Sequence, residues 1–289
     1  MALQLWHIIR TNTQVMKTII VPTGFTADSE HTVQFAADMA MHIQATLLLL
    51  HVYQLPVSIT EVPASFLTLD QIKETTAERL AAQKKAIERH VNNSIEVVTE
   101  ARAGNIADEL QKICATVHPF AVVMGCSQSG KLERMFFGSA SLSAIHHLET
   151  PVFLIPPGAS FHPVKRIGLA YDFDHDMPDT PQQEIRSMLK EFNAELHVLN
   201  VHNSGGLTPE NRRHTFLLHK AIADLHPQYH VIDRRNVEEG LNELVQQNGI
   251  DFMIIIPRKH ALLEALFRKS HADQVALHAQ VPLMAIHHE

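Results

Sequence analysis

The sequence has few of the features that mark secreted, membrane-spanning or nucleic-acid-binding proteins. Only two cysteines occur among 289 residues, Cys114 and Cys126, which argues against a disulfide framework and suits a reducing cytoplasm. No apolar run approaches the ~20 residues that a membrane-spanning helix needs. Lys and Arg number 24 against 31 Asp and Glu, a formal net charge of −7, and no basic cluster stands out. We therefore expect a cytoplasmic protein without a nucleic-acid or membrane partner.

The first fifteen residues also lack recognisable targeting features. They contain the only tryptophan, Trp6, but neither a basic leading region nor an apolar stretch long enough for a secretory signal. Met16 then opens the first clear strand pattern. We interpret residues 1–15 as an N-terminal extension with Met16 as the ancestral start. A short docking arm is the alternative.

Apolar residues, by contrast, are abundant at 45% and form alternating strand-like and helix-like segments. Residues 46–53 read TLLLLHVY, which is typical of a central parallel strand covered on both faces. The first half predicts strands at 17–22, 46–53, 96–99, 121–124 and 152–155, and helices at 29–42, 68–90, 106–116 and 139–148. The second half predicts strands at 166–170, 195–201, 229–232, 252–256 and 283–286, and helices at 182–192, 210–225, 241–247 and 273–279. This pattern predicts an α/β protein with two tandem, doubly wound, parallel five-stranded sheets.

The two halves are related in sequence. Residues 120–155 slide without a gap onto residues 251–286, an offset of 131. Seven identities result: Leu132 with Leu263, Glu133 with Glu264, Phe136 with Phe267, Ser139 with Ser270, His147 with His278, Pro151 with Pro282, and Ile155 with Ile286. They respect one strand–loop–helix–strand frame, and residues 156–163 have the composition of a linker. The chain is therefore interpreted as an internal duplication with domains at 16–157 and 164–289.

Ligands of an open parallel sheet bind beyond the carboxyl ends of the strands, where the strand order reverses. In the first domain this points to residues 21–24 and to residues 124–128, followed by Gly138 and Ser139 at a helix start. These segments resemble the universal stress protein family, whose domains open with M-K-x-I-[IV]-V-P-x-D-x-S, continue with L-x-L-L-H-V and end with M-G-x2-G-x9-G-S. The counterparts here are residues 16–26, 47–52 and 124–139, and the resemblance is weaker over 164–287. The arrangement is similar to that of tandem members of the family.

The resemblance implies an adenine nucleotide alpha hydrolase-like fold and an ATP site in the first domain only. In nucleotide-binding members the glycine-rich loop lets backbone N–H groups approach the phosphates, which sit at a helix N-terminus. The candidate nucleotide-binding residues are Thr23, Val52, Met124, Gly125, Gln128, Gly130, Gly138 and Ser139. Two positions depart from the family pattern. Gln128 replaces a loop glycine, with Gly130 nearby, and Gly24 replaces the acid that resembles an adenine contact.

The second domain departs differently. It keeps an acid after its first strand, Asp172, but Ile256, Lys259 and Lys269 stand where the first domain has Gly125, Gln128 and Gly138. A bulky isoleucine blocks close approach of the backbone to a ligand. We therefore expect the second domain to be degenerate and free of nucleotide.

Simpler interpretations stay open at several of these positions. Ser139 also suits a plain helix N-cap, and Gly125 and Gly138 also suit tight turns. Cys126 is a hypothetical redox sensor, if a helix terminus lowers the pKa of its thiol, or an ordinary loop thiol. The alternating acids that begin at Asp172 fail the calcium-loop pattern and predict a solvated loop. The 21 histidines include adjacent pairs but no ligand spacing, so we expect no metal site, with an adventitious zinc as the alternative.

The pattern favours a stress-response protein that acts by binding or regulation. The sequence has no G-x-S-x-G elbow, no Walker lysine–serine pair and no metal dyad, so we expect no enzyme. Two alternatives remain: an interaction or scaffold protein that binds no nucleotide, and an enzyme that uses a nucleotide. By resemblance, the strands at 152–155 and 283–286 pair across an intramolecular pseudo-dimer, which leaves room for a homodimer and for an unknown protein partner.

Overall fold

The computed structural model describes residues 17–54, 69–128, 135–171, 181–202, 209–256, 268–269, 275–277 and 281–286. By its contacts the chain divides into two compact units, Met1–Val123 and Met124–Glu289. The expected extension at 1–15, Gly130 and the acidic loop that begins at Asp172 lie outside the described residues. The bounds of the two domains at 16–157 and 164–289 stay a prediction.

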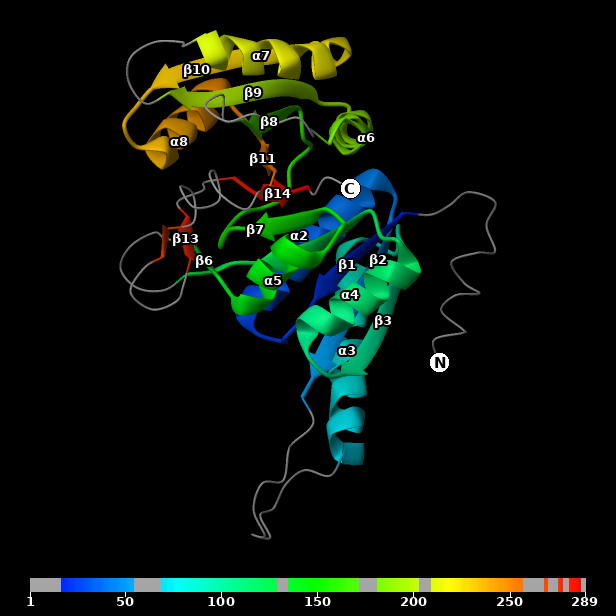
Figure 1. The fold of residues 1–289 in the computed structure, drawn as a ribbon. Helices are drawn as coiled ribbons and strands as arrows, with labels where there is room; N and C mark the ends of the chain where they lie inside the picture. Colours follow the sequence, from blue (N-terminus) through cyan, green and yellow to red (C-terminus); the bar gives the residue numbers. More distant parts are fainter. Residues whose placement is uncertain are drawn as a thin grey trace. The chain divides into compact units, whose positions relative to one another are not determined.

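The first unit is a parallel sheet with helices. Its elements are β1 (Thr18–Pro22), α2 (Ala27–Ile43), β2 (Thr46–Tyr53), α3 (Leu69–His90), β3 (Val97–Ala103), α4 (Ile106–Val117) and β4 (Ala121–Gly125), the last of which crosses the boundary between the units. The strands lie in the order β4-β1-β2-β3, and all three pairings are parallel. Figure 1 labels β1, β2 and β3 of this sheet. The apolar run Leu47–Leu50 in β2 is at most 1% exposed, so this strand forms the centre of the core as expected.

Local chemistry fixes where α2 begins and ends. The Thr26 side chain accepts a hydrogen bond from the Ser29 N–H, and the Ser29 side chain accepts one from the Thr26 N–H, which makes a capping box. Gln44 closes the helix in the left-handed conformation. Buried residues such as Val33 and Ala40 recur at helical spacing, so one face of α2 is apolar and lies in the core.

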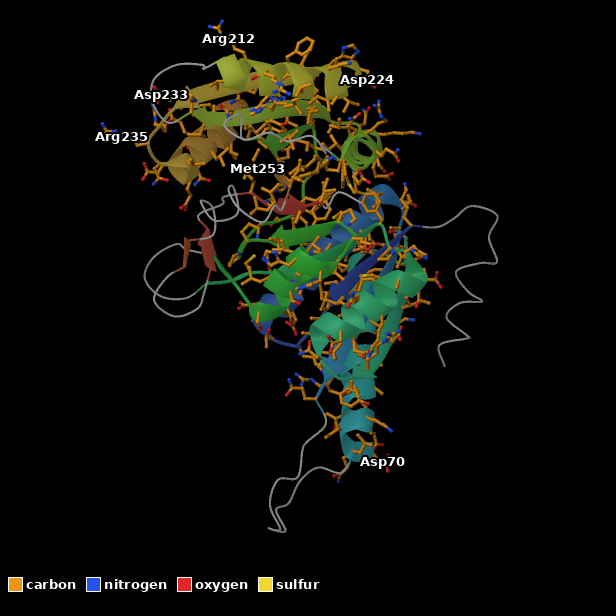
Figure 2. The ribbon with its side chains drawn as sticks, in the orientation of Figure 1. Asp70, Arg212, Asp224, Asp233, Arg235 and Met253 are labelled. Carbon is orange, nitrogen blue, oxygen red and sulfur yellow. The ribbon has the colours of Figure 1, made fainter. Side chains whose placement is uncertain are left out.

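The second unit is also built from helices and a largely parallel sheet. Its elements are α5 (Ser139–His147), β7 (Val152–Ile155), β8 (Arg166–Ala170), α6 (Gln182–Phe192), β9 (Glu195–His202), α7 (Pro209–Ile222), the 3-10 helix η1 (Ala223–Leu225), β10 (Gln228–Asp233), α8 (Val237–Asn248), β11 (Phe252–Ile255) and β14 (Leu283–Ala285). The order β10-β9-β8-β11-β14 is parallel throughout and reverses between β8 and β11, as in a doubly wound fold. Figure 2 shows charged side chains such as Asp70 and Arg235 pointing outward, whereas Met253 in β11 is only 3% exposed.

The last strands of the two sequence repeats pair with each other. β7 and β14 are antiparallel, with Leu154 opposite Leu283 and Phe153 opposite Met284. The ring of Phe153 also contacts Phe252 edge-on, with centroids 5.4 Å apart. This confirms the strand pairing expected for an intramolecular pseudo-dimer. It also explains why β7, although part of the first repeat, belongs to the second unit by contacts.

The second unit also holds a small antiparallel sheet that the sequence did not predict. It consists of β12 (Arg268–Lys269), β13 (Val275–Leu277), β6 (Met135–Phe137) and β5 (Ser127–Gln128), in that order. The helix predicted at 273–279 is therefore wrong, because residues 275–277 form a strand paired with β6. A three-residue apolar run is compatible with a helix or a strand. Here the backbone pairing with β6 makes residues 275–277 a strand. A smaller error concerns the edge strand β3, which is longer than the predicted 96–99 and pairs with β2 along its whole length.

Candidate functional site

The carboxyl end of β1 is the first part of the candidate site. β4 pairs in parallel with β1 at Ala121 and Val122, so both strands point to the same edge of the sheet. Thr23, directly after β1, is 4% exposed, and its N–H donates to the Leu50 carbonyl over 2.8 Å. Gly24 is exposed, and a Cβ added there would meet nothing within 4 Å. The structure therefore has room for the acid that the family pattern places at this position.

The next residue, Phe25, adopts a conformation that a bulky side chain rarely takes. Its φ of 56° lies in the left-handed region, so surrounding contacts have to hold it there. Its ring lies 4.5 Å from the His51 ring and 4.4 Å below the guanidinium carbon of Arg79. The Arg79 Nη2 donates to the Phe25 carbonyl over 3.4 Å, and the His51 Nδ1–H donates to the Thr23 carbonyl over 2.7 Å. Sequence reasoning missed this cluster, since His51 was noted only as part of a motif.

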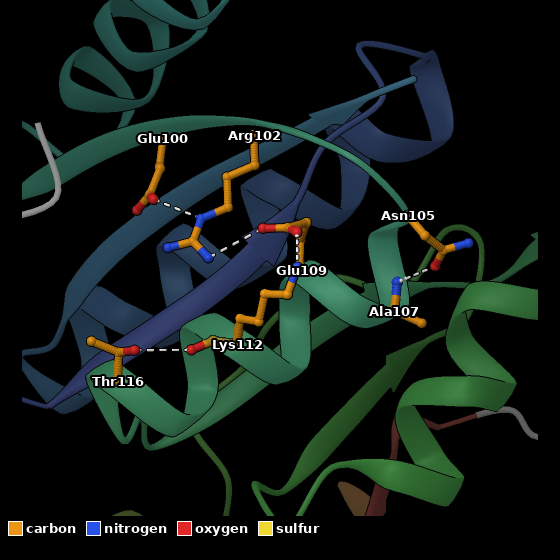
Figure 3. A network of polar contacts seen from close by, with 7 residues as sticks. All are labelled: Glu100, Arg102, Asn105, Ala107, Glu109, Lys112 and Thr116. Atoms are coloured by element: carbon orange, nitrogen blue, oxygen red, sulfur yellow. Dashed lines mark hydrogen bonds and ion pairs between the residues drawn. The ribbon is translucent and has the colours of Figure 1, made fainter. Parts of the chain in front are cut away.

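Val52 lies beside an ion-pair network at the end of β3. It is half-buried and stands opposite Arg102 in the register of β2 and β3. The Arg102 guanidinium contacts Glu100 at 2.7 Å and Glu109 at 3.3 Å, and the Lys112 Nζ lies 2.6 Å from Glu109 (Figure 3). The hydrogen bond from Lys112, with the charge of both cations, holds the pKa of Glu109 below its usual range, although burial opposes the shift. This network ties β3 to α4.

The carboxyl end of β4 holds Met124, Gly125 and Cys126 in the second unit. Met124 and Cys126 are 6% and 4% exposed, and the Cys126 N–H donates to the Ile155 carbonyl over 3.0 Å. Burial raises the pKa of the Cys126 thiol to about 12. Burial and the raised pKa favour the ordinary buried thiol over the redox sensor, because a reactive cysteine needs a lowered pKa. No disulfide joins Cys126 to Cys114, and both are buried.

Gln128 lies in a strand. Ser127 and Gln128 form β5 and pair in antiparallel fashion with Phe136 and Met135. A residue with a Cβ favours such an extended conformation, whereas the glycine of the family pattern leaves the loop adaptable. Gln128 is therefore held by backbone pairing with β6 rather than in an adaptable loop.

α5 begins beside two exposed candidate residues. Gly138 is its N-cap, with φ −64° and ψ 159°, and no side chain caps the helix. The N-cap interpretation of Ser139 is thus wrong, because the helix starts one residue earlier than a serine cap requires. Gly138 and Ser139 are exposed, and a Cβ added at Gly138 would meet nothing within 4 Å, so the space beside this terminus is open. An uncapped helix N-terminus with accessible N–H groups favours negative charge.

The second repeat differs at the corresponding positions. Ile256, which replaces Gly125, is 3% exposed and fills the space after β11. Lys269, which replaces Gly138, lies in the strand β12, and β13 occupies 275–277 where the repeat pattern predicts a helix. At the described positions of this segment there is no helix N-terminus to match that of α5. Lys259 lies outside the described residues.

A histidine pair that sequence spacing could not reveal lies on β9 and β10. The His197 Nδ1 and the His230 Nε2 are 2.9 Å apart, and the rings stack at 5.0 Å with 8° between their planes. The buried His197 Nε2 has no hydrogen-bond partner in the described chain and lies 3.7 Å from a carboxylate oxygen of Glu195. Burial lowers the pKa of both imidazoles; the charge of Arg166 lowers that of His197 further, and Glu195 opposes this.

Neither a metal-binding cluster nor a membrane-spanning helix is found among the described residues. Within the described residues, no three His, Cys, Asp or Glu side chains gather closely enough to hold a metal ion. The adjacent pair His146 and His147 is exposed, with ring planes 74° apart, so the two imidazoles point in different directions. Among the described helices, none has the length and apolar character that a membrane crossing requires.

Comparisons with known proteins agree with the fold. A universal stress protein from Archaeoglobus fulgidus DSM 4304 has a similar structure, with a TM-score of 0.69 and 16% identity over 93% of this chain and 98% of its own. A putative universal stress protein from Pseudomonas aeruginosa UCBPP-PA14 has a TM-score of 0.57 and 12% identity, with 94% of each chain covered. No curated protein matched the sequence. The model of the universal stress protein family matches twice, at residues 16–156 and 163–287, and the chain is therefore a tandem member of that family.

Proposed function

We propose that this stress-response protein acts by binding an adenine nucleotide in its first repeat. The observation that carries the proposal is the N-terminus of α5, where Gly138 leaves the backbone accessible and no side chain occupies the cap. Phosphate oxygens bind such a terminus through its N–H groups and its dipole. The family pattern supports the same assignment, since the chain keeps Gly125, Gly138 and Ser139 of the nucleotide motif.

Binding is proposed for the first repeat alone. The second repeat has a buried isoleucine at Ile256 and strand structure at Lys269, so its counterpart segment lacks both the glycine and the helix start. The first repeat has its own weaknesses: Gly24 lacks the acid, and Gln128 is committed to β5. We therefore expect ATP to bind the first repeat with modest affinity, in the micromolar to millimolar range.

The proposed role is binding rather than turnover, in the cytoplasm. The chain contains no nucleophile elbow and no Walker motif, so a bound nucleotide would act as a signal. The antiparallel β7–β14 pair supports the intramolecular pseudo-dimer and covers two strand edges. We further propose that the chain forms a homodimer and that a protein partner recognises its nucleotide-bound state. If nucleotide does not bind, the scaffold function is the alternative.

Calorimetric titration of the full chain with ATP and Mg²⁺ tests the proposal. The informative variant is Gly138→Asp, which places a carboxylate at the N-cap. Aspartate caps helices well, so stability is kept or raised by a few tenths of a kcal/mol, whereas its charge repels phosphate. Ser160→Asp adds the same charge at an exposed linker position and serves as the matched control.

The outcomes separate the three function classes. Saturable binding that Gly138→Asp weakens at least tenfold, and Ser160→Asp does not, supports the sensor. Absence of binding at millimolar ATP favours the scaffold, and equal binding by Gly138→Asp places the nucleotide elsewhere. Steady release of ADP or AMP from ATP during the same incubation would show an enzyme.

A further inference from the structure

A cavity of about 370 Å³ opens between α2 and α3 of the first unit. Its α2 side is formed by Glu30, Val33 and Gln34, which share one helix face at i, i+3 and i+4. Its α3 side extends over one face from Arg79 to Ile87. None of the candidate nucleotide residues lines it, so this cavity is a separate feature. Its volume lies in the range of small-molecule sites, roughly 300–1,000 Å³.

Opposite charges face the cavity from different helices. Glu30 comes from α2 and Arg79 from α3, and no ion pair joins them in the described part of the first unit. The Arg79 guanidinium is already oriented, because it lies over the Phe25 ring and one of its N–H groups bonds the Phe25 carbonyl. A guanidinium has five N–H donors in a fixed plane, so the others can meet a carboxylate with little further ordering.

The floor and the interior of the cavity differ in polarity. Val33 and Ile87 line the cavity but are only 1% and 4% exposed, so the exposed Ala82 and Ala86 provide most of its apolar surface. Ala82 and Ala86 line the α3 side, and their small side chains leave the space open. The buried Gln83 Oε1 has no hydrogen-bond partner in the described chain. A buried amide oxygen without a partner is costly, so this wall of the cavity is not optimised for stability.

Phe25 adds an independent observation. It lines the cavity, and its backbone is held in the left-handed region by contacts with His51 and Arg79. Bulky residues in such a conformation are enriched at binding and switching sites. The strained residue therefore lies at the cavity and supports a role for it beyond imperfect packing.

We propose that this cavity binds a small zwitterion of amino-acid size with an apolar side chain. The ligand's ammonium group would meet the Glu30 carboxylate and its carboxylate the Arg79 guanidinium. Its apolar side chain would lie against Ala82 and Ala86. The pairing of both charges and the apolar floor distinguishes this ligand class from a plain amine, a plain acid or a nucleotide.

Ligand-observed NMR with the full chain tests the proposal, with L-leucine as the probe. Two analogues each lack one charge: 4-methylpentanoic acid has no ammonium group, and 3-methylbutylamine has no carboxylate. Leucine is expected to bind with a dissociation constant of about 1 mM or tighter, and each analogue at least about tenfold more weakly. Analogues that bind as well as leucine overturn the zwitterion assignment. Failure of leucine to saturate by about 20 mM overturns the site.

Two pairs of variants locate the binding. Ala82→Leu fills the cavity, whereas Ala81→Leu adds the same bulk to an exposed neighbour on α3 that does not line it. Glu30→Gln removes the cavity's carboxylate, and Glu78→Gln removes an exposed one outside it. Leucine affinity should fall at least about tenfold in Ala82→Leu and Glu30→Gln only, with thermal unfolding confirming that all four variants fold. Unchanged affinity in Ala82→Leu, or an equal loss in Ala81→Leu, contradicts the proposal.

Discussion

The paired imidazoles of His197 and His230 should make the stability of this protein fall with pH in a defined window. The 2.9 Å contact between Nδ1 and Nε2 holds one proton, since two protons there would place two N–H groups head to head. The nearby Glu195 carboxylate favours the proton of His197 on Nε2. The His230 Nε2–H then donates to the His197 Nδ1. The intact pair can accept one more proton, at the His230 Nδ1, but not two.

The sign and size follow from proton counting. Burial lowers the pKa of both histidines in the folded protein, so the unfolded chain binds more protons below its own pKa of about 6.5. Stability from the pair is therefore present above that value and is lost as pH falls below it, towards the lower folded pKa. At low pH the two histidines of the unfolded chain bind two added protons, whereas the native pair binds at most one. The free energy of unfolding then changes by at least about 1.4 kcal/mol per pH unit.

Urea unfolding at fixed pH values from about 7.5 to 5 measures this slope. The double variant His197→Leu with His230→Leu replaces both partners by apolar side chains and removes the titrating pair. Between pH 6.5 and 5.5, the free energy of unfolding should fall by at least about 1 kcal/mol less in this variant than in the wild type. The control is His162→Asn with His226→Asn, two exposed histidines. If the double leucine variant shows the wild-type pH dependence, the single-proton account of the pair is refuted.

Three further predictions concern single residues. Gly24→Asp restores the acid of the family pattern in open space, so it should strengthen ATP binding severalfold in calorimetry; weaker binding would count against the assignment. Gly240→Ala should destabilise the protein by about 1–3 kcal/mol in urea unfolding, because its Cβ would come within 2.6 Å of Val201; an unchanged midpoint would contradict this. Cys126, buried and with a pKa raised to about 12, should react with Ellman's reagent only after unfolding; rapid reaction in the native state would disprove its burial.

Regular elements with a strong pattern could be predicted closely from the sequence. β2 and β7 have the predicted bounds, because a continuous apolar run between turn signals has few alternatives. The repeat also placed β14 beside β7, through the resemblance to tandem family members. These features depend on local pattern and on the repeat, and both can be read from one chain.

Features that depend on contacts between distant residues could not be predicted. The segment at 275–277 became a strand because β6 offers it backbone partners, and nothing in its own sequence records that choice. The Phe25 contact with Arg79 joins residues from a loop and a remote helix, and the His197–His230 pair joins two strands. At the candidate site, the sequence indicated Gly125 and Gly138 as candidate binding residues. That Gly138 is the N-cap of α5 and that Gln128 lies in a strand could be seen only in the structure.

Photolabelling with 8-azido-ATP, followed by peptide mapping, tests the central claim most directly. The label should map to the repeat at residues 16–156, compete with excess ATP and disappear in Gly138→Asp. Labelling of the repeat at 163–287 to the same extent, or labelling that ATP does not displace, would contradict a nucleotide site confined to the first repeat.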